Sequence, residues 1–173
     1  MEHGGQRYGS VQSVLSEYHD YLEMCVKLGY SMRNSFVLFP RDLQKAHDRV
    51  QRRVKIKDSI QLREDFAAAM EAISRNLDFE KDNLRIVVPE GPDDLVAEGQ
   101  ALHHCISTRA ESVARRESIV LFIRLADDPG TPLVTCEIKG RHVIEARGMG
   151  NCLPTPEVQT FIDQFERQVL MAA

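Results

Sequence analysis

The spacing of apolar residues predicts that the N-terminal part of the chain is helical. Between Val11 and Val26, apolar residues recur every three or four positions, as on one helix face, and Gly29 follows where a left-handed cap would end the helix. A second stretch, Arg41 to Leu77, is rich in helix-forming residues and contains no Gly or Pro. Its apolar stripe falters between Lys55 and Ser59, so we expect a bend or break there.

The segment between these two helices, Tyr30 to Phe39, has no helical period. It ends in an apolar run, Phe36 to Phe39, that stops at Pro40, and this pattern predicts an anchoring loop or a short strand. Pro40 is expected in the first turn of the following helix, because that position needs no backbone donor.

The pattern changes after Asp78. Short β-branched or alternating runs bounded by turn residues predict strands at residues 84–88, 119–125, 132–138 and 142–146. Helices are predicted over residues 93–104 and 108–116 and from Thr155 onwards. We therefore predict an α+β fold: a small antiparallel β-meander with helices packed on one face, preceded by an N-terminal helical region.

The same pattern suggests three segments. Residues 1–10 are expected to form a flexible lead-in, residues 11–80 a helical region that carries a basic helix, and residues 81–173 the α+β core. The last two are expected to form one compact unit, since a chain of 173 residues is most simply one domain. No apolar run approaches the length that crosses a bilayer, and the N-terminus lacks a signal-peptide pattern, so we expect a cytoplasmic protein without membrane contact.

The net charge of -4 hides a basic segment. Between residues 41 and 57, seven basic residues stand against two acidic ones, and such a helix can contact phosphate or an acidic protein surface. A solvated helix face is the alternative interpretation. The candidate binding residues are Arg41, Lys45, Arg49, Arg52, Arg53, Lys55 and Lys57, together with Arg109 and Arg147 near the candidate chemistry described next.

The candidate catalytic residues are His103, His104 and Cys105, which follow one another at the predicted end of a helix. A thiolate beside an imidazolium is an activated nucleophile, and Glu145 or Asn151 could orient the base. The alternative is that these residues are structural.

The four cysteines form no C-x-x-C pair and are expected to be free thiols. We expect no cofactor and no metal, although a site built from His104, Cys105, Cys136 and Cys152 stays an alternative. The two glycines of the segment Arg147 to Asn151 suggest backbone in an unusual conformation or close to a ligand.

Several blocks in one order resemble the PcfJ-like family, whose members are encoded on bacterial conjugative plasmids, phages and related mobile elements. The resemblance extends from about Tyr18 to Phe165. It rests on residues 18–22, 36–43, 98–105, 121–124 and 135–138, and on Arg147, Gly148 and Asn151. The chain departs from the family at Ser107, Thr108 and Arg109, where glycines and a tyrosine are usual, and at Glu145, where glutamine is usual.

The resemblance implies no particular reaction, and it places the protein in the cytoplasm of a bacterial host cell. We predict a mobile-element accessory protein that binds a macromolecule, either inhibiting a host nucleic-acid-targeting defence complex or assisting DNA transfer. The expected partner is a protein or a protein–nucleic-acid complex, contacted by the basic helix. One alternative is a hydrolase or transferase that uses Cys105 and His104, and the second is the metal site.

Overall fold

The computed structural model describes residues 9–172, which belong to two compact units, Met1–Ile60 and Gln61–Ala173. Except for Gly9 and Ser10, the expected flexible lead-in over residues 1–10 lies outside the described residues. Within residues 9–172, no helix combines the length and the apolar character that a membrane crossing needs.

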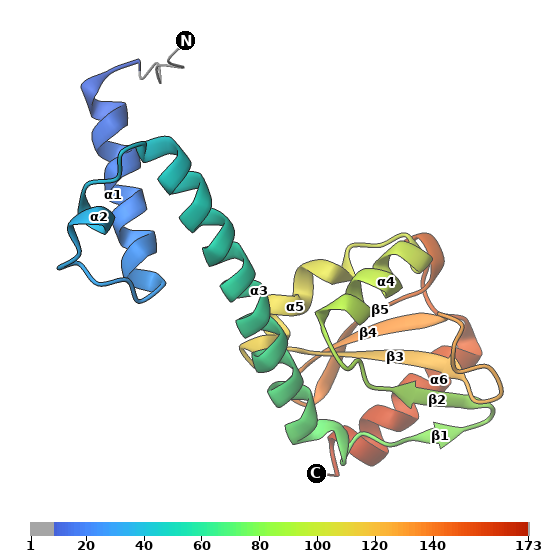
Figure 1. Ribbon diagram of the computed structural model, residues 1–173. Helices are drawn as coiled ribbons and strands as arrows, with labels where there is room; N and C mark the ends of the chain where they lie inside the picture. Colours follow the sequence, from blue (N-terminus) through green and yellow to red (C-terminus); the bar gives the residue numbers. More distant parts are fainter. Residues whose placement is uncertain (1–8, 173) are drawn as a thin grey trace. The chain divides into compact units, whose positions relative to one another are not determined.

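Unit 1 contains helix α1 (Val11–Lys27), the short helix α2 (Ser35–Leu38) and the first part of α3 (Leu43–Ser74) (Figure 1). Ser10 caps α1 by accepting a hydrogen bond from the Ser13 amide, and Gly29 adopts a φ of +77° just beyond its end. Both boundaries agree with the sequence pattern. A small core of Tyr21, Cys25 and Val50 joins α1 to α3.

The apolar run before Pro40 forms α2, so the expected strand is wrong, and a loop is found over residues 30–34 of the segment. Three contacts stabilise this single helical turn: the Asn34 side chain accepts from the Phe36 amide, and the hydroxyls of Tyr18 and Tyr21 donate to the carbonyls of residues 38 and 37. Pro40 also lies outside α3, because Asp42 caps that helix by accepting from the Lys45 amide at 3.1 Å.

Helix α3 is continuous, so the expected bend between Lys55 and Ser59 is wrong. Every residue from Lys55 to Gln61 is exposed, and the border between the two compact units falls within this stretch. The apolar stripe is interrupted because the side chains of this stretch pack against neither unit's core. The backbone ladder continues, since no Gly or Pro interrupts it.

Unit 2 is built on a five-stranded antiparallel sheet in the order β1-β2-β3-β4-β5. The strands are β1 (Glu80–Lys81), β2 (Leu84–Val87), β3 (Ile119–Leu125), β4 (Val134–Lys139) and β5 (His142–Arg147). The second part of α3 belongs to unit 2 and supplies Phe66 and Met70 to its core. The further helices are α4 (Pro92–Leu102), α5 (Ala110–Ala114) and α6 (Pro156–Phe165), with short turns η1 (Ile106–Arg109), η2 (Met149–Asn151) and η3 (Glu166–Leu170).

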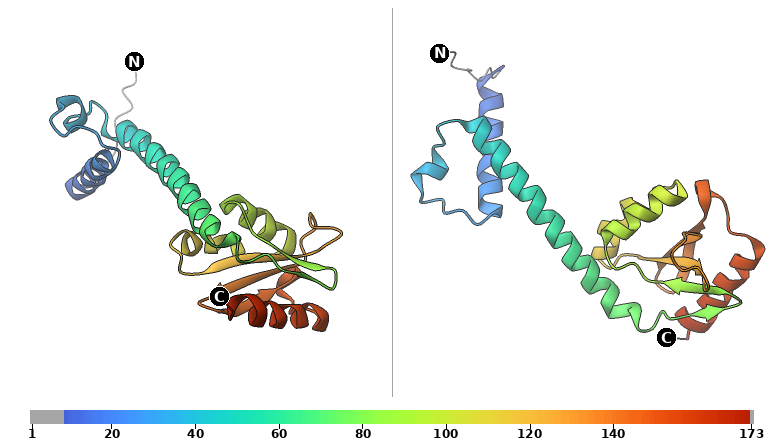
Figure 2. Two further views of the ribbon diagram at one scale, coloured as in Figure 1. Left: turned by 90° about the horizontal axis from the view of Figure 1, so that it is seen from below. Right: turned by 45° about the vertical axis from the view of Figure 1, so that its right-hand side comes forward.

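The α+β class and the N-terminal helical region are confirmed, with one correction to the layering. Five consecutive residues of β3, Val120–Arg124, are buried, which requires cover on both faces because successive side chains point to opposite sides. Figure 2 shows α4 on one side of the sheet and α6 on the other. Helices therefore cover both faces of the sheet, and the expectation of one covered face is wrong.

A buried ion pair attaches α4 to the sheet. Glu98 is 2% exposed and Arg124 is 5% exposed, and the two form a bidentate pair whose Nη1–Oε1 distance is 2.9 Å. Thr135 on the neighbouring strand donates to the same carboxylate at 3.0 Å, and the guanidinium lies 4.8 Å from the centre of the Phe122 ring. These contacts determine where α4 sits along β3 and β4.

Removing one partner of this pair should destabilise unit 2 strongly. We expect Arg124→Met to lower the free energy of unfolding by about 3–5 kcal/mol, because it leaves the Glu98 carboxylate buried and uncompensated. Combining it with Glu98→Gln should recover most of the loss, since the amide oxygen still accepts from Thr135. Urea unfolding followed by circular dichroism measures both. A double variant no more stable than the single one would contradict this account.

The exposed edge of β5 is covered by a carboxylate of η3. Glu166 accepts from the Val143 amide at 2.9 Å, and its other oxygen lies 3.0 Å from His142 Nδ1. The amide hydrogen bond, followed by the His142 contact, lowers the pKa of Glu166 below its ordinary value of 4.5. An edge strand with free amides invites pairing with another strand, and Glu166 blocks that at one position.

This lowered pKa predicts a pH-dependent contribution to stability. The ionised carboxylate stabilises the fold above pH 4.5, and this contribution disappears as the pH falls through the lower folded-state pKa of Glu166. Glu166→Gln should therefore cost about 1 kcal/mol at pH 7 and progressively less towards pH 3. Urea titrations of both proteins across that range test this. A difference that stays constant down to pH 3 would show that the ionised carboxylate is not responsible.

Candidate functional site

Five segments of unit 2 meet around a small cavity on the face of the sheet that α4 covers. Its volume is about 70 Å³, whereas cofactor sites typically enclose about 300–1,000 Å³, so it has room for a functional group. The lining residues are His104, Cys105, Ile106, Arg109, Thr135, Glu137, Glu145, Arg147 and Asn151. Six of these were candidates from the sequence.

The end of α4 delivers His104 and Cys105 to this cavity. His103 ends the helix in the left-handed conformation, with a φ of 54°. The His104 amide then donates to the Gly99 carbonyl at 3.0 Å, and a Cβ on Gly99 would lie 2.8 Å from the His104 carbonyl oxygen. Glycine is therefore required for the turn. His103 is exposed and does not line the cavity, so the structure separates the two histidines.

The sheet contributes a polar floor. Thr135 and Glu137 of β4 pair with Arg147 and Glu145 of β5, respectively, so all four side chains share one face. Neither Thr135 nor Glu137 was among the site residues predicted from the sequence. Their alternation with the apolar residues of β4 was the signal that would have identified them.

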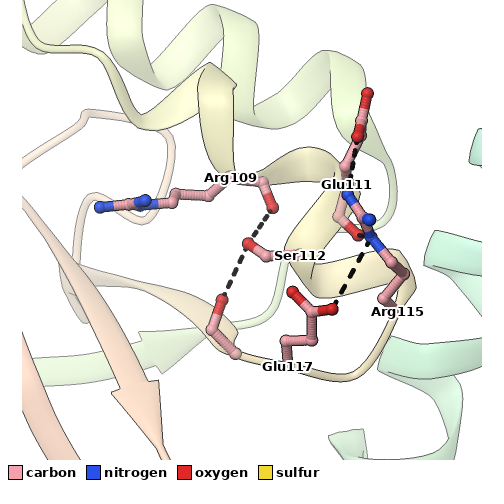
Figure 3. A network of polar contacts seen from close by, with 6 residues as sticks. Arg109, Glu111, Ser112, Arg115 and Glu117 are labelled. Carbon is pink, nitrogen blue, oxygen red and sulfur yellow. Dashed lines mark hydrogen bonds and ion pairs between the residues drawn. The ribbon is translucent and has the colours of Figure 1, made fainter.

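Two ion pairs neutralise the charges around the cavity. Arg109 Nε lies 3.0 Å from the carboxylate of Glu137, which is 4% exposed, and Arg147 lies 3.3 Å from Glu145. Figure 3 shows the Arg109 side chain extending away from the polar contacts of α5. In those contacts the Ser112 hydroxyl donates to the Arg109 carbonyl at 2.9 Å, which anchors the backbone while the guanidinium extends to Glu137.

A thiol, an imidazole and an amide side chain line the cavity, but the hydrogen bonds that would activate the thiol are not formed. Among the described residues, the Cys105 thiol forms no hydrogen bond, and the buried His104 Nε2 has no partner. Glu145, a candidate for orienting the base, is paired with Arg147. A nucleophile and its base normally lie within hydrogen-bond reach. The geometry therefore supports recognition of a small polar group more directly than attack by the thiol.

The proposed metal ligands are not assembled. No group of three or more His, Cys, Asp or Glu residues within residues 9–172 could hold a metal ion. Cys136 lies on the opposite face of β4 from Thr135 and Glu137, and burial raises the pKa of its thiol to about 12. Cys152 lines a different groove from Cys105. The alternation of side chains along β4 thus overturns the metal-site alternative.

The basic segment of α3 separates into two groups. Arg53 donates to the Tyr30 hydroxyl, and Lys57 donates to the Lys27 carbonyl at 2.8 Å, so both cations brace unit 1. At 100° per residue, the other cations of the helix project away from the buried Val50. This outward cationic face consists of Lys45, Arg49, Arg52 and Lys55, all exposed. Arg41, just before the helix, is exposed too.

The outward cationic face is poorly neutralised by the chain itself. Lys45 pairs with Asp42 at 3.1 Å. In contrast, Arg49, Arg52 and Lys55 have no hydrogen-bond or ion-pair partner in the part of the chain that the structure describes. Like charges three and four positions apart on a helix repel each other by about 0.2–0.5 kcal/mol per pair. Asp48 lies exposed on the same face and offsets part of this repulsion, and an anionic partner would relieve the rest.

Comparison with known proteins identifies relatives but no activity. The profile of the family described as "PcfJ-like protein" matches residues 17–162. The uncharacterized protein Lin1253/Lin1744 of Listeria innocua is 29% identical over 147 residues, which cover 83% of this chain. The chain spans about a third of that relative's length, at 32%. No solved structure matches the chain. The profile covers most of the sequence, including every residue that lines the cavity, and the chain belongs to the PcfJ-like protein family.

Proposed function

We propose that this protein is a mobile-element accessory protein that binds a nucleic acid, or a protein–nucleic-acid complex, through the outward cationic face of α3. The observation that carries the proposal is the set of exposed, unpartnered cations Arg49, Arg52 and Lys55 among the described residues. In a chain with a net charge of -4, such a concentration of unpaired cations gives a local positive potential that attracts phosphate.

The dimensions of the face support contact with a phosphate backbone. Lys45 and Lys55 are ten residues apart, which corresponds to about 15 Å along a helix. Phosphates follow one another at about 3.4 Å of axial rise along each strand of duplex DNA, so the face can meet several of them. Such contacts give affinity without sequence preference.

Two biological settings fit this chemistry, and both follow from the mobile elements that the family resemblance implies. A protein that occupies the nucleic-acid channel of a host defence complex would protect the element. A protein that coats or guides the transferred strand would assist DNA transfer. In each setting the contacted surface is rich in phosphate.

The cavity in unit 2 supports a second candidate function. It brings His104, Cys105 and Asn151 to one place, and the free Nε2 of His104 would be the proton acceptor. In that hydrolase or transferase, Cys105 would be the nucleophile and Asn151 would orient the imidazole. Closure around a substrate would have to bring the thiol and the imidazole within hydrogen-bond distance, as catalytic contacts often tighten on binding.

Charge reversal tests the first proposal. The triple variant Arg49→Glu, Arg52→Glu, Lys55→Glu should weaken binding of a fluorescein-labelled oligonucleotide at least tenfold. Its plot of log affinity against log salt should also be shallower by about two to three units, because three phosphate contacts are lost. Fluorescence anisotropy at several salt concentrations measures both quantities.

A matched triple variant controls for net charge. Arg75, Lys81 and Lys139 are exposed in unit 2 and have no hydrogen-bond or ion-pair partner among the described residues. Reversing them to glutamate changes the net charge equally but should alter the salt dependence by less than one unit. Equal losses of affinity in the two triple variants would sink the assignment to α3.

The reactivity of two thiols tests the second candidate. Cys105 and Cys152 are both free and exposed. Since neither thiol of the pair is activated under the first proposal, iodoacetamide at pH 7 should modify both at rates within about threefold. Mass spectrometry of the two peptides gives the rates, and Cys152→Ser confirms the assignment. Labelling of Cys105 more than tenfold faster, abolished by His104→Ala, would favour the enzyme over the binding protein.

A further inference from the structure

Two phenylalanines of unit 1, both at the short helix α2, are exposed to solvent. Phe36 is 82% exposed and Phe39 is 73% exposed, although burying such a side chain ordinarily stabilises a fold. They lie three positions apart, Phe36 inside α2 and Phe39 at its C-cap. Figure 1 shows α2 and the connection that leads from it into α3.

The turn that carries these rings is preorganised. The Phe36 amide donates to the Asn34 side chain at 2.9 Å, and the Phe39 amide donates to the Ser35 carbonyl at 2.8 Å. The Tyr18 and Tyr21 hydroxyls donate to the turn's carbonyls at 2.6 and 2.8 Å. A partner that contacts the rings therefore loses little entropy in ordering the backbone.

Exposed cations adjoin the rings in the sequence. Arg33 precedes Phe36 by three residues, Arg41 follows Phe39 by two, and both guanidinium groups are without a partner in the described residues. Four residues beyond Arg41, the outward cationic face begins at Lys45 in the first turn of α3. Aromatic rings flanked by unpaired cations match the two requirements of single-strand binding, which are stacking on bases and contact with phosphates.

We propose that unit 1 binds single-stranded nucleic acid, with Phe36 and Phe39 stacking on unpaired bases while Arg33, Arg41 and the outward cationic face contact the phosphates. This inference rests on the proposed function and names its substrate class. A duplex offers phosphates to the cations but encloses its base faces in its own stack. The rings therefore favour the single strand, whose unpaired bases can stack on them.

The test compares one labelled DNA 20-mer as a single strand and as a duplex, using the full chain. Phe36→Ala with Phe39→Ala should weaken single-strand binding at least tenfold and duplex binding less than threefold. Val11→Ala with Val26→Ala is the matched control, because both residues are exposed apolar positions of the same unit, and it should change neither affinity. Circular dichroism confirms that each variant keeps its helix content.

Tryptophan fluorescence can report directly on contact between residue 39 and the bases. The chain contains no tryptophan, so Phe39→Trp introduces a single reporter. Its fluorescence should be quenched when the unlabelled single strand is added, and much less by the duplex. Poly-glutamate, which carries charge without bases, should leave the emission unchanged. Quenching or a spectral shift by poly-glutamate alone would replace the single strand with an acidic protein partner and overturn the inference.

The outcomes separate this inference from the function on which it rests. If the α3 charge reversal leaves binding of both DNA forms unchanged, the proposed function fails. If charge reversal weakens both forms but the paired Phe→Ala variant leaves the ratio of single-strand to duplex affinity intact, the proposed function stands. In that case the stacking inference is overturned.

Discussion

The position of the cavity depends on one buried ion pair. Glu98 and Arg124 are both almost inaccessible to solvent, and a carboxylate in that environment is tolerable only with a bidentate guanidinium and a further donor, which Thr135 provides. Because Glu98 lies in the middle of α4, this pair determines where the helix ends over the sheet. The tight turn at Gly99 then places His104 and Cys105 above β4 and β5.

The ion pair also explains why polar residues occur in a buried sheet. The face of β3 and β4 beneath α4 carries Arg124, Thr135 and Glu137, and each has a partner supplied by α4 or η1. The opposite face carries Leu121, Ile123 and Cys136 against the apolar core, with Phe161 and Phe165 of α6 in the same cluster. The α4 face also buries Val120 and Phe122, so it mixes polar with apolar residues, whereas the other face is apolar. Such a sheet can be covered on both sides while only one side forms a site.

How far the sequence predicted the structure depended on whether each signal was local. Helix α1 and strands β2 to β5 were predictable because caps, turns and apolar periods lie within a few residues of the elements they specify. The continuity of α3 was not, since exposure of Lys55–Gln61 ends the apolar stripe without ending the helix. Helix α2 depends on hydroxyl groups of Tyr18 and Tyr21, more than fifteen residues away. Cover on both sheet faces depends on tertiary packing, which no single segment encodes.

For the cavity, the sequence located the His104 and Cys105 side and named Glu145 and Asn151, but the partners of Arg109 and Arg147 required the strand register. The cavity and the outward cationic face of α3 differ in how their charges are balanced. The arginines of the cavity are each matched by a glutamate, so a ligand there would be selected by hydrogen bonds and would gain little from long-range attraction. Arg49, Arg52 and Lys55 of α3 have no partner among the described residues, so their attraction extends to about the Debye length, roughly 8–10 Å in physiological salt. The electrostatics therefore favour α3 over the cavity as the surface that would attract an anionic partner under the proposed function.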